Sequence, residues 1–137
     1  VGLPKDLFER PKTTFVGYFI GSPAMNLLDS KILSDYEIKL DNYKIKTNTN
    51  LSKLKSDEIK LGIRSEFIKI AQGQAENVIK TSIKRVEDFG NFKLLTTRIG
   101  KYTIKTKVSR EAEIPSENIR LFFPADKCCV YSKNKLI

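Results

Sequence analysis

Histidine and tryptophan are absent from this chain of 137 residues, and methionine occurs once. Without histidine, the side chain that most often acts as general base or metal ligand near neutral pH is missing. The chain also lacks the Gly-rich phosphate loop of nucleotide-binding enzymes and the Gly-x-Ser-x-Gly elbow of hydrolases. Carboxylate pairs such as Glu111 and Glu113 are expected in solvated turns. No apolar run approaches the roughly 20 residues of a membrane-spanning helix. These absences argue against an enzyme.

Cysteine is scarce, and the two cysteines, Cys128 and Cys129, are adjacent. Neighbouring residues of a strand point to opposite faces, so these thiols are poorly placed to share a metal or to form an ordinary disulfide. We expect one thiol in the core and the other on the surface, in a reducing compartment.

The chain is strongly basic, with a formal net charge of +9 and a pI of about 9.6. Such a balance can mark a nucleic-acid partner. Here, however, the lysines alternate with apolar residues, as at Lys39, Lys44, Lys105 and Lys107. That alternation is typical of a solvated strand face, so no nucleic-acid partner is expected. The apolar fraction of 40% is enough for one domain with its own core.

The first residues favour helices. Pro4 suits a first helical turn, good helix formers follow it, and Pro11 ends the segment. A second helix is expected from about Lys12, because Phe15, Val16, Phe19 and Ile20 form one apolar stripe. Gly21, Ser22 and Pro23 then end that helix.

From Ala24 onward the pattern predicts strands. Ile38 and Leu40 would pair with Ile45 and Tyr43 across a two-residue loop, Asp41-Asn42. A second hairpin is expected across Gly100-Lys101, where Gly in the first loop position favours a type II′ turn. With a strand near 58–64 and others near 78–86, 119–123 and 128–132, the chain reads as nine or ten short strands. This cadence predicts a small barrel or sandwich, and no internal repeat is evident.

Several segments, in order, resemble one family. Residues 2–11 are similar to the last helix of the ATPase domain in carbohydrate-type ABC importer ATPases. The run Phe19-Ile20-Gly21-Ser22-Pro23, followed by Met25-Asn26, resembles the hinge that follows that domain. Further likeness lies in residues 61–66, in 85–90 and in 124–128. The chain thus resembles the C-terminal regulatory domain, a TOBE (transport-associated OB) domain, of maltose/glycerol-3-phosphate-type ATP-binding subunits. Ser65 stands where this family usually has Pro, and Phe67 where it often has His.

The resemblance implies an all-β fold: an OB-fold-like small barrel of the TOBE type, preceded by one or two short N-terminal helices. Residues 1–23 would be the helical tail of the ATPase domain and the hinge, with Gly21, Ser22 and Pro23 at the hinge itself. Residues 24–137 would form the regulatory domain. The nucleotide-binding motifs would lie upstream of Val1, so this fragment would hold no ATP, magnesium or other cofactor and would not be an enzyme.

The implied role is regulation and dimerisation of a bacterial carbohydrate importer at the cytoplasmic face of the membrane. The parent protein would be a homodimer, would meet permease subunits through its ATPase domain and could receive a cytoplasmic regulator. Arg64, Glu66 and Glu87 are candidate dimer or partner contacts by charge-assisted hydrogen bonds. Each could instead brace a turn locally, and surface ion pairs of that kind contribute only about 0–1 kcal/mol.

Two alternatives stay open at this point. A basic OB-type barrel could bind single-stranded nucleic acid, but the aromatic candidates for base stacking share strand faces with Ile and Leu and are expected in the core. They are Tyr36, Tyr43 and Tyr102. Related transport-associated domains bind oxyanions such as molybdate, and the abundance of Lys, Arg, Ser and Thr allows the same here.

Overall fold

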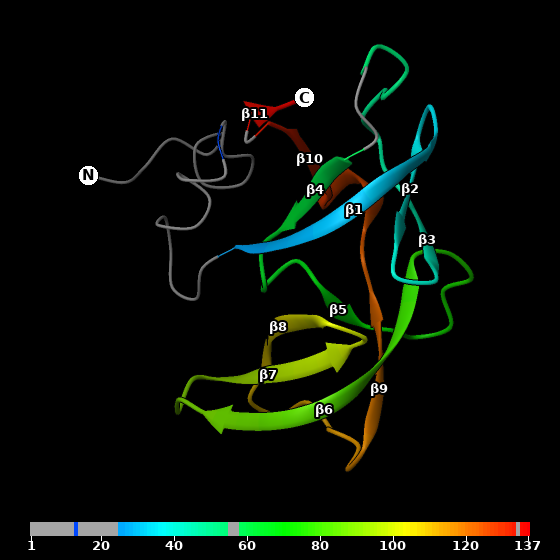
Figure 1. Cartoon of the computed structure of the whole chain (residues 1–137). Helices are drawn as coiled ribbons and strands as arrows, with labels where there is room; N and C mark the ends of the chain where they lie inside the picture. The colour runs from blue at the N-terminus through cyan, green and yellow to red at the C-terminus, as the bar shows by residue number, and fades with distance from the viewer. Residues whose placement is uncertain (1–12, 14–24, 55–57, 134) are drawn as a thin grey trace.

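The computed structural model describes residue 13 and residues 25–54, 58–133 and 135–137. Its described residues form eleven strands and one 3-10 helix, Ala125–Lys127, without an α-helix (Figure 1). The Gly21-Ser22-Pro23 hinge and most of the expected N-terminal helices lie outside the described residues. The exception is Thr13, which was expected in the second helix and instead forms an isolated β-bridge with Lys135. None of the helical segments described could cross a membrane. The strands are β1 (Asn26–Ser34), β2 (Glu37–Leu40), β3 (Tyr43–Lys46), β4 (Glu58–Ile63), β5 (Lys69–Ile70), β6 (Val78–Asp88), β7 (Phe92–Ile99), β8 (Tyr102–Ser109), β9 (Asn118–Phe122), β10 (Cys129–Ser132) and β11 (Lys135–Leu136).

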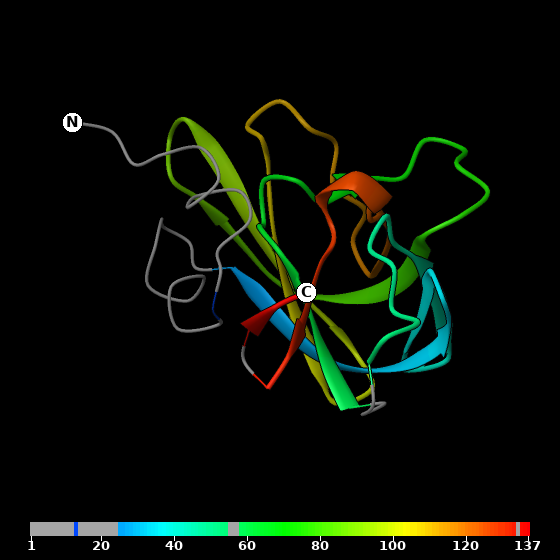
Figure 2. The ribbon, with the colours of Figure 1, turned by 90° about the horizontal axis from the view of Figure 1, so that it is seen from above.

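The strands form two antiparallel sheets that enclose one core. The first sheet has six strands in the order β11-β10-β4-β1-β2-β3, and the second has five in the order β5-β9-β6-β7-β8. Figure 2 shows β11, coloured red, beside β10 at the C-terminus. The all-β prediction is therefore confirmed, with β5 and β11 as short strands that the sequence pattern did not reveal.

Both predicted hairpins are present in the predicted register. Leu40 pairs with Tyr43 and Ile38 with Ile45, while Ile99 pairs with Tyr102. Asp41 and Gly100 both adopt positive φ, 54° each, and the second residue of each loop does not. One positive φ at the first loop position is the backbone pattern of a type II′ turn, whose twist matches that of the flanking strands.

The two sheets are built from equivalent halves, a repeat hidden in the sequence. The meander β1-β2-β3 corresponds to β6-β7-β8, and β4 lies beside β1 as β9 lies beside β6. A β-bulge also recurs, between Ile32 and Ser34 in β1 and between Ile83 and Arg85 in β6. Each half then sends its last strand to the other sheet: β5 pairs with β9, and β10 pairs with β4.

Contacts between equivalent positions locate an approximate two-fold axis between the halves. At one end, the two hairpin tips touch, since a Cβ added at Gly100 would lie 2.8 Å from Oδ1 of Asp41. At the other end, Nζ of Lys127 lies 4.6 Å from the ring centre of Phe67. Residues 67 and 127 occupy matching places after β4 and β9, so this contact also crosses the axis.

Two asparagines join the sheets in matching fashion. The amide of Asn26 in β1 accepts from the backbone N–H of Lys105 (2.9 Å) and donates to its C=O (2.8 Å). Asn77, just before β6, does the same with Lys46, at 2.8 Å for both bonds. The same amides also donate to Ile63 and Phe123 at the ends of β4 and β9. Each buried amide thus supplies the hydrogen bonds that a neighbouring strand would supply to β8 or β3.

The core contains aliphatic side chains from both sheets, including Ile38, Leu61, Ile79 and Leu95, which are fully buried. A smaller cluster of Met25, Cys129 and Tyr131 covers part of the outer face of the first sheet. Because both faces of β10 are covered, Cys128 and Cys129 are both buried, 1% and 0% exposed. The expectation of one exposed thiol is therefore wrong.

The tyrosines fall into two groups. Tyr43 and Tyr102 pack against the core as expected. Tyr36 lies in the turn between β1 and β2 and is 47% exposed, so its assignment to the core is wrong. The strand begins one residue later, at Glu37, and the alternation that assigned Tyr36 to an inner face does not extend into the turn.

Candidate functional site

The turn after β4 holds two of the predicted site residues. The Arg64 guanidinium Nε lies 3.1 Å and 3.2 Å from the two carboxylate oxygens of Glu66. The backbone closes the turn with a bond from the N–H of Phe67 to the C=O of Arg64 (3.0 Å). The N–H of Lys107 in β8 donates to the C=O of Ser65 (3.0 Å), which ties the turn to the second sheet.

Burial separates the two partners of this pair. The Arg64 side chain is 1% exposed, whereas that of Glu66 is 29% exposed. A buried guanidinium requires a charged partner close by, and Glu66 provides one. The pair therefore braces the turn within the chain, and Glu66 presents the accessible part. A contact of either residue with a dimer mate or another protein stays a prediction.

The hydroxyl of Ser65 has an unusual environment in the same turn. Ser65 is fully buried, and its Oγ has no hydrogen-bond partner among the described residues. The equivalent position after β9 is Ala125, which carries no polar side chain. A buried hydroxyl without a partner lowers the free energy of unfolding, so the Ser at this position costs stability.

Glu87 lies near the end of β6, before the turn at Asp88 and Gly90 where the sequence pattern placed it. Its Oε1 is 3.5 Å from Nε of Arg85, and its side chain is 32% exposed. Glu87 belongs to the outer face of the second sheet, on a different element from Arg64 and Glu66. The structure does not gather the three predicted contact residues into one cluster, and the role of Glu87 stays a prediction.

A groove of about 640 Å³ opens beside the two touching hairpin tips. Tyr102 lies at its edge, with its hydroxyl donating to the C=O of Asp29 (2.8 Å). Cations and anions line the groove in equal number, so it offers no net charge to select an oxyanion. The charged lining residues are Asp29, Lys31, Lys39, Asp41, Glu58 and Lys101.

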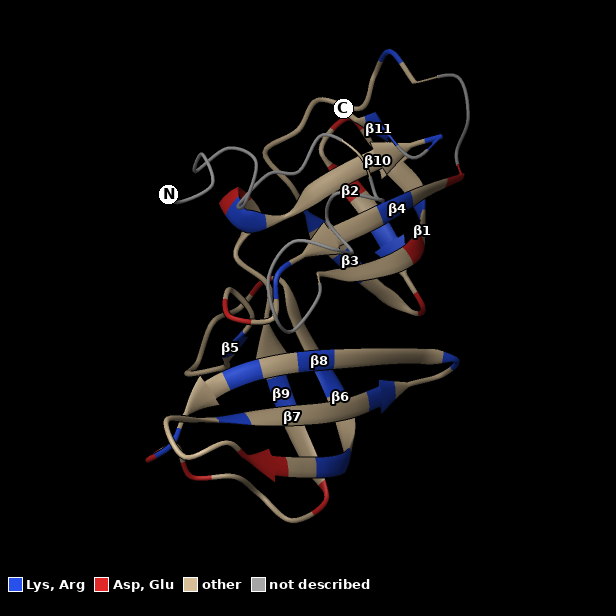
Figure 3. Cartoon of the chain, turned by 90° about the vertical axis from the view of Figure 1, so that its left-hand side faces the viewer, with Lys and Arg blue, Asp and Glu red and all other residues tan. Residues whose placement is uncertain are grey.

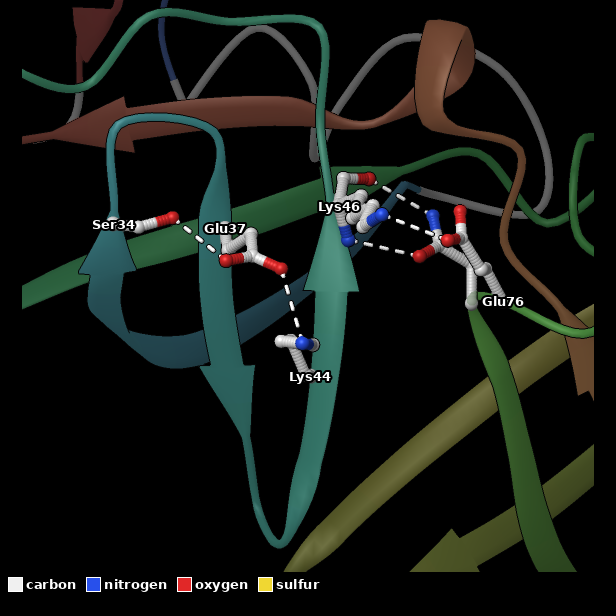
Figure 4. A network of polar contacts seen from close by, with 6 residues as sticks. Ser34, Glu37, Lys44, Lys46 and Glu76 are labelled. Atoms are coloured by element: carbon white, nitrogen blue, oxygen red, sulfur yellow. Dashed lines mark hydrogen bonds and ion pairs between the residues drawn. The ribbon is translucent and has the colours of Figure 1, made fainter.

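A second groove, of about 880 Å³, lies between the turn after β1 and the segment before β6. Figure 4 shows the polar network at this groove, in which Lys46 Nζ meets Glu76 Oε1 at 2.7 Å. The hydrogen bond from Ser34 and the neighbouring ammonium of Lys44 lower the pKa of Glu37 below its usual value of 4.5. The charged residues that line this second groove are mainly acidic: Asp35, Glu37 and Glu76, against one cation, Lys46. This groove disfavours an anionic ligand.

The described residues contain no group of three or more His, Cys, Asp or Glu side chains placed to hold a metal ion. The ionisable groups in both grooves take part in local pairs or face solvent. Among the described residues that line the two grooves, no nucleophile lies next to a base, an arrangement that covalent catalysis needs.

Residues 21–68 match the family model of the MalK OB fold domain. Among curated proteins, a trehalose/maltose import ATP-binding protein of Thermococcus litoralis is 25% identical over 97% of this chain and 39% of its own length. An uncharacterised ABC transporter ATP-binding protein of Escherichia coli is 32% identical over 93% of this chain and 37% of its own. An sn-glycerol-3-phosphate import ATP-binding protein of Psychromonas ingrahamii is 40% identical over 53% of this chain and 18% of its own.

This chain accordingly spans less than two-fifths of the length of these three relatives. Among solved structures, the cytoplasmic molybdate-binding protein ModG has a similar fold, with a TM-score of 0.64. The likeness covers 82% of this chain and 98% of that protein at 14% identity, which bears on the fold alone. The resemblance seen in the sequence and the OB-like fold are both confirmed.

Proposed function

Since this chain belongs to the MalK-type OB fold domains, we propose that it is the regulatory and dimerisation domain of a carbohydrate importer's ATP-binding subunit. The observation that carries the proposal is the match, along nearly the whole chain, to ATP-binding proteins more than twice as long, one of them a trehalose/maltose import protein. Residues 24–137 would be the regulatory domain, and residues 1–23 would link it to the ATPase domain through Gly21, Ser22 and Pro23.

In this proposal the chain itself neither binds nor hydrolyses ATP. ATP and magnesium would be held by the parent subunit, which would dock on membrane-embedded permease subunits from the cytoplasmic side. The last strand of each half pairs within the other sheet, β5 with β9 and β10 with β4, which favours a domain that moves as one body. Such a body could transmit motion to a dimer mate or a regulator, with Glu66 and Glu87 as accessible contacts.

Light scattering and nucleotide titration of residues 1–137 test this proposal. We expect a dimer whose mass falls toward that of one chain on dilution, and no binding of a fluorescent ATP analogue at millimolar concentration. The charge reversals Glu66→Lys and Glu87→Lys are each expected to shift the dimer toward monomer if these residues contact the mate. Tight binding of the ATP analogue would contradict the proposal, as would a strictly monomeric chain at high concentration.

A further inference from the structure

The second groove differs in character from most of the molecular surface. Figure 3 shows Lys and Arg, in blue, across β6, β7, β8 and β9. The groove instead has acids at three of its four charged lining positions. Its volume of about 880 Å³ lies within the range of roughly 300–1,000 Å³ that is typical of small-ligand sites.

Most of the charged side chains in the second groove are already paired. The hydroxyl of Ser34 donates to Oε1 of Glu37 at 2.8 Å, and Nζ of Lys44 lies 3.2 Å from the other carboxylate oxygen of Glu37. Glu76 is paired with Lys46 in the same way (Figure 4). These contacts brace the walls of the groove, and they leave each of these two carboxylates with an ammonium partner.

Three other side chains of the groove are not engaged. They are the carboxylate of Asp35, the phenol of Tyr36 and the amide of Asn48. In the part of the chain that the structure describes, none of the three makes a side-chain hydrogen bond or ion pair, and no ring or ammonium stacks on Tyr36. All three are exposed, so an acceptor, an aromatic face and an amide face the solvent in one groove.

The backbone holds these side chains in position. The N–H of Thr47 donates to the C=O of Tyr36 (2.8 Å), and the N–H of Leu51 donates to the C=O of Asp35 (2.7 Å). Tyr36 does not pack against the core, whereas Tyr43 does. Core packing therefore does not account for the place of the Tyr36 ring, and the fixed turn lowers the entropy that a ligand would lose on binding it.

We propose that the second groove binds a neutral polyhydroxylated ligand of about the size of a disaccharide. The exposed face of the Tyr36 ring can pack against the C–H face of a sugar ring, while its hydroxyl stays at the wet edge. The Asp35 carboxylate accepts hydrogen bonds from sugar hydroxyls, and the Asn48 amide both donates and accepts. Each group thus meets a complementary part of the same ligand.

Charged ligands suit the second groove less well. The acids of the lining repel an anion. A cation would meet few uncompensated charges, because Glu37 and Glu76 already have lysine partners and Asp35 is the one lining acid without such a partner among the described residues. A ligand that needs hydrogen bonds and an aromatic face, but no charge, is favoured.

Binding of maltose to residues 1–137, followed through amide chemical shifts in NMR spectra, tests this site. We expect saturable shifts at millimolar maltose, centred on Asp35, Tyr36 and Asn48. Tyr36→Ala should weaken binding about tenfold, and Asp35→Asn, which keeps an acceptor, by less than about threefold. Phe89→Ala is the matched control, because it removes an exposed ring from the β6–β7 turn, and it should leave the affinity unchanged.

Three outcomes would overturn the assignment: no saturable shifts with maltose; equal weakening by Tyr36→Ala and Phe89→Ala; or tighter binding of spermidine than of maltose, with its loss in Asp35→Asn, which indicates a cation site. Thermal unfolding verifies that each variant is folded. The carbohydrate-import role proposed above supplies only the choice of maltose as the probe. That role is tested by dimer mass and nucleotide titration, so either proposal can fail without the other.

Discussion

The two sheets of this protein are a natural comparison, because one backbone plan is used twice with different side chains. Inside, the halves match: Ile38 and Thr97, Ile45 and Ile104, and Leu61 and Leu121 occupy equivalent places. Outside, the halves differ: the Met25, Cys129 and Tyr131 cluster covers part of the first sheet, while Asp29 and Lys31 of β1 correspond to Lys80 and Ser82 of β6. Inward positions are constrained by packing, and outward positions are free to differ.

The halves also differ in one hairpin. Beyond the shared bulge, β6 and β7 continue with the pairs Val86–Leu95 and Glu87–Leu94, up to a turn capped by Asp88. The β1–β2 connection turns at once, after Ser34. The extension carries Phe89, 53% exposed, at its tip. The second half therefore has the longer hairpin and the larger exposed tip.

The largest expected effect compares the two joining asparagines. Asn77→Ala should lower the free energy of unfolding by roughly 3–5 kcal/mol, because it strands buried backbone groups of Lys46 and Phe123 and leaves Ala at positive φ. Asn26→Ala should cost roughly 2–4 kcal/mol, since Asn26 makes matching bonds without positive φ. Urea denaturation measures both.

Asn77→Gly is the matched control for that comparison. Glycine tolerates the φ of 59° found at Asn77 but cannot replace the side-chain bonds. It should therefore unfold at a denaturant concentration between those of the unaltered chain and Asn77→Ala. Equal stability of Asn77→Ala and the unaltered chain would show that the amide does not join the sheets.

The second prediction concerns Gly62, whose counterpart in the other half is Phe122. A Cβ at Gly62 would lie 2.5 Å from the ring of Tyr131 and 3.0 Å from Sδ of Met25. Gly62→Ala should therefore cost about 1–3 kcal/mol by overpacking the covering cluster. In a double-mutant cycle with Tyr131→Leu, the two changes should cost less together than the sum of the single changes. Simple additivity in thermal unfolding would contradict the clash.

The third prediction sharpens the comparison of Ser65 with Ala125. Ser65→Ala removes a buried hydroxyl that has no partner and should raise the free energy of unfolding by about 1 kcal/mol. Ser30→Ala is the control, because the Ser30 hydroxyl donates to the C=O of Leu28 at 3.1 Å. We expect the control to be neutral or destabilising in the same urea titration. Destabilisation by Ser65→Ala would contradict the burial argument.

The smallest expected effect is a pH dependence at Glu37 in the first half. The folded-state pKa of Glu37 is lowered by Ser34 first and by Lys44 next, so the ionised form stabilises the fold. That contribution is complete above the usual pKa of 4.5 and is lost as pH falls through the lower folded value. Glu37→Gln should flatten the loss of thermal stability below pH 4.5. Thr96, at the equivalent position, does not titrate, and Thr96→Ser should leave the profile unchanged.

Local pattern predicted the hairpins correctly because each depends on residues close in the chain. Asp41-Asn42 and Gly100-Lys101 define the register through turn geometry, and alternation then assigns inward and outward faces. The same reasoning failed at Cys129 and Tyr36. Whether those side chains are covered depends on Met25 and Tyr131, or on the end of a strand, which alternation does not report.

The repeat escaped detection because its identical residues are confined to short stretches separated by unlike ones. The Tyr-x-Ile-Lys-Thr sequence of residues 43–47 recurs at 102–106, but Asp29 and Lys31 of β1 correspond to Lys80 and Ser82 of β6. The turn at residues 64–66 was also only partly predictable. The sequence allowed two interpretations of Arg64 and Glu66, a contact with a partner or a local brace of the turn. The burial of Arg64, its bond to Glu66 and the unpartnered Ser65 hydroxyl required coordinates.

By itself, the sequence determined the strand-rich class, the two hairpin registers and the family, because turn residues, alternation and short motifs act over short stretches of chain. Only the tertiary structure decided which distant strands pair and that β5 and β10 change sheets. Those features arise from contacts between segments far apart in the chain. Many pairings satisfy the same local pattern, and only packing of the complete core selects one of them.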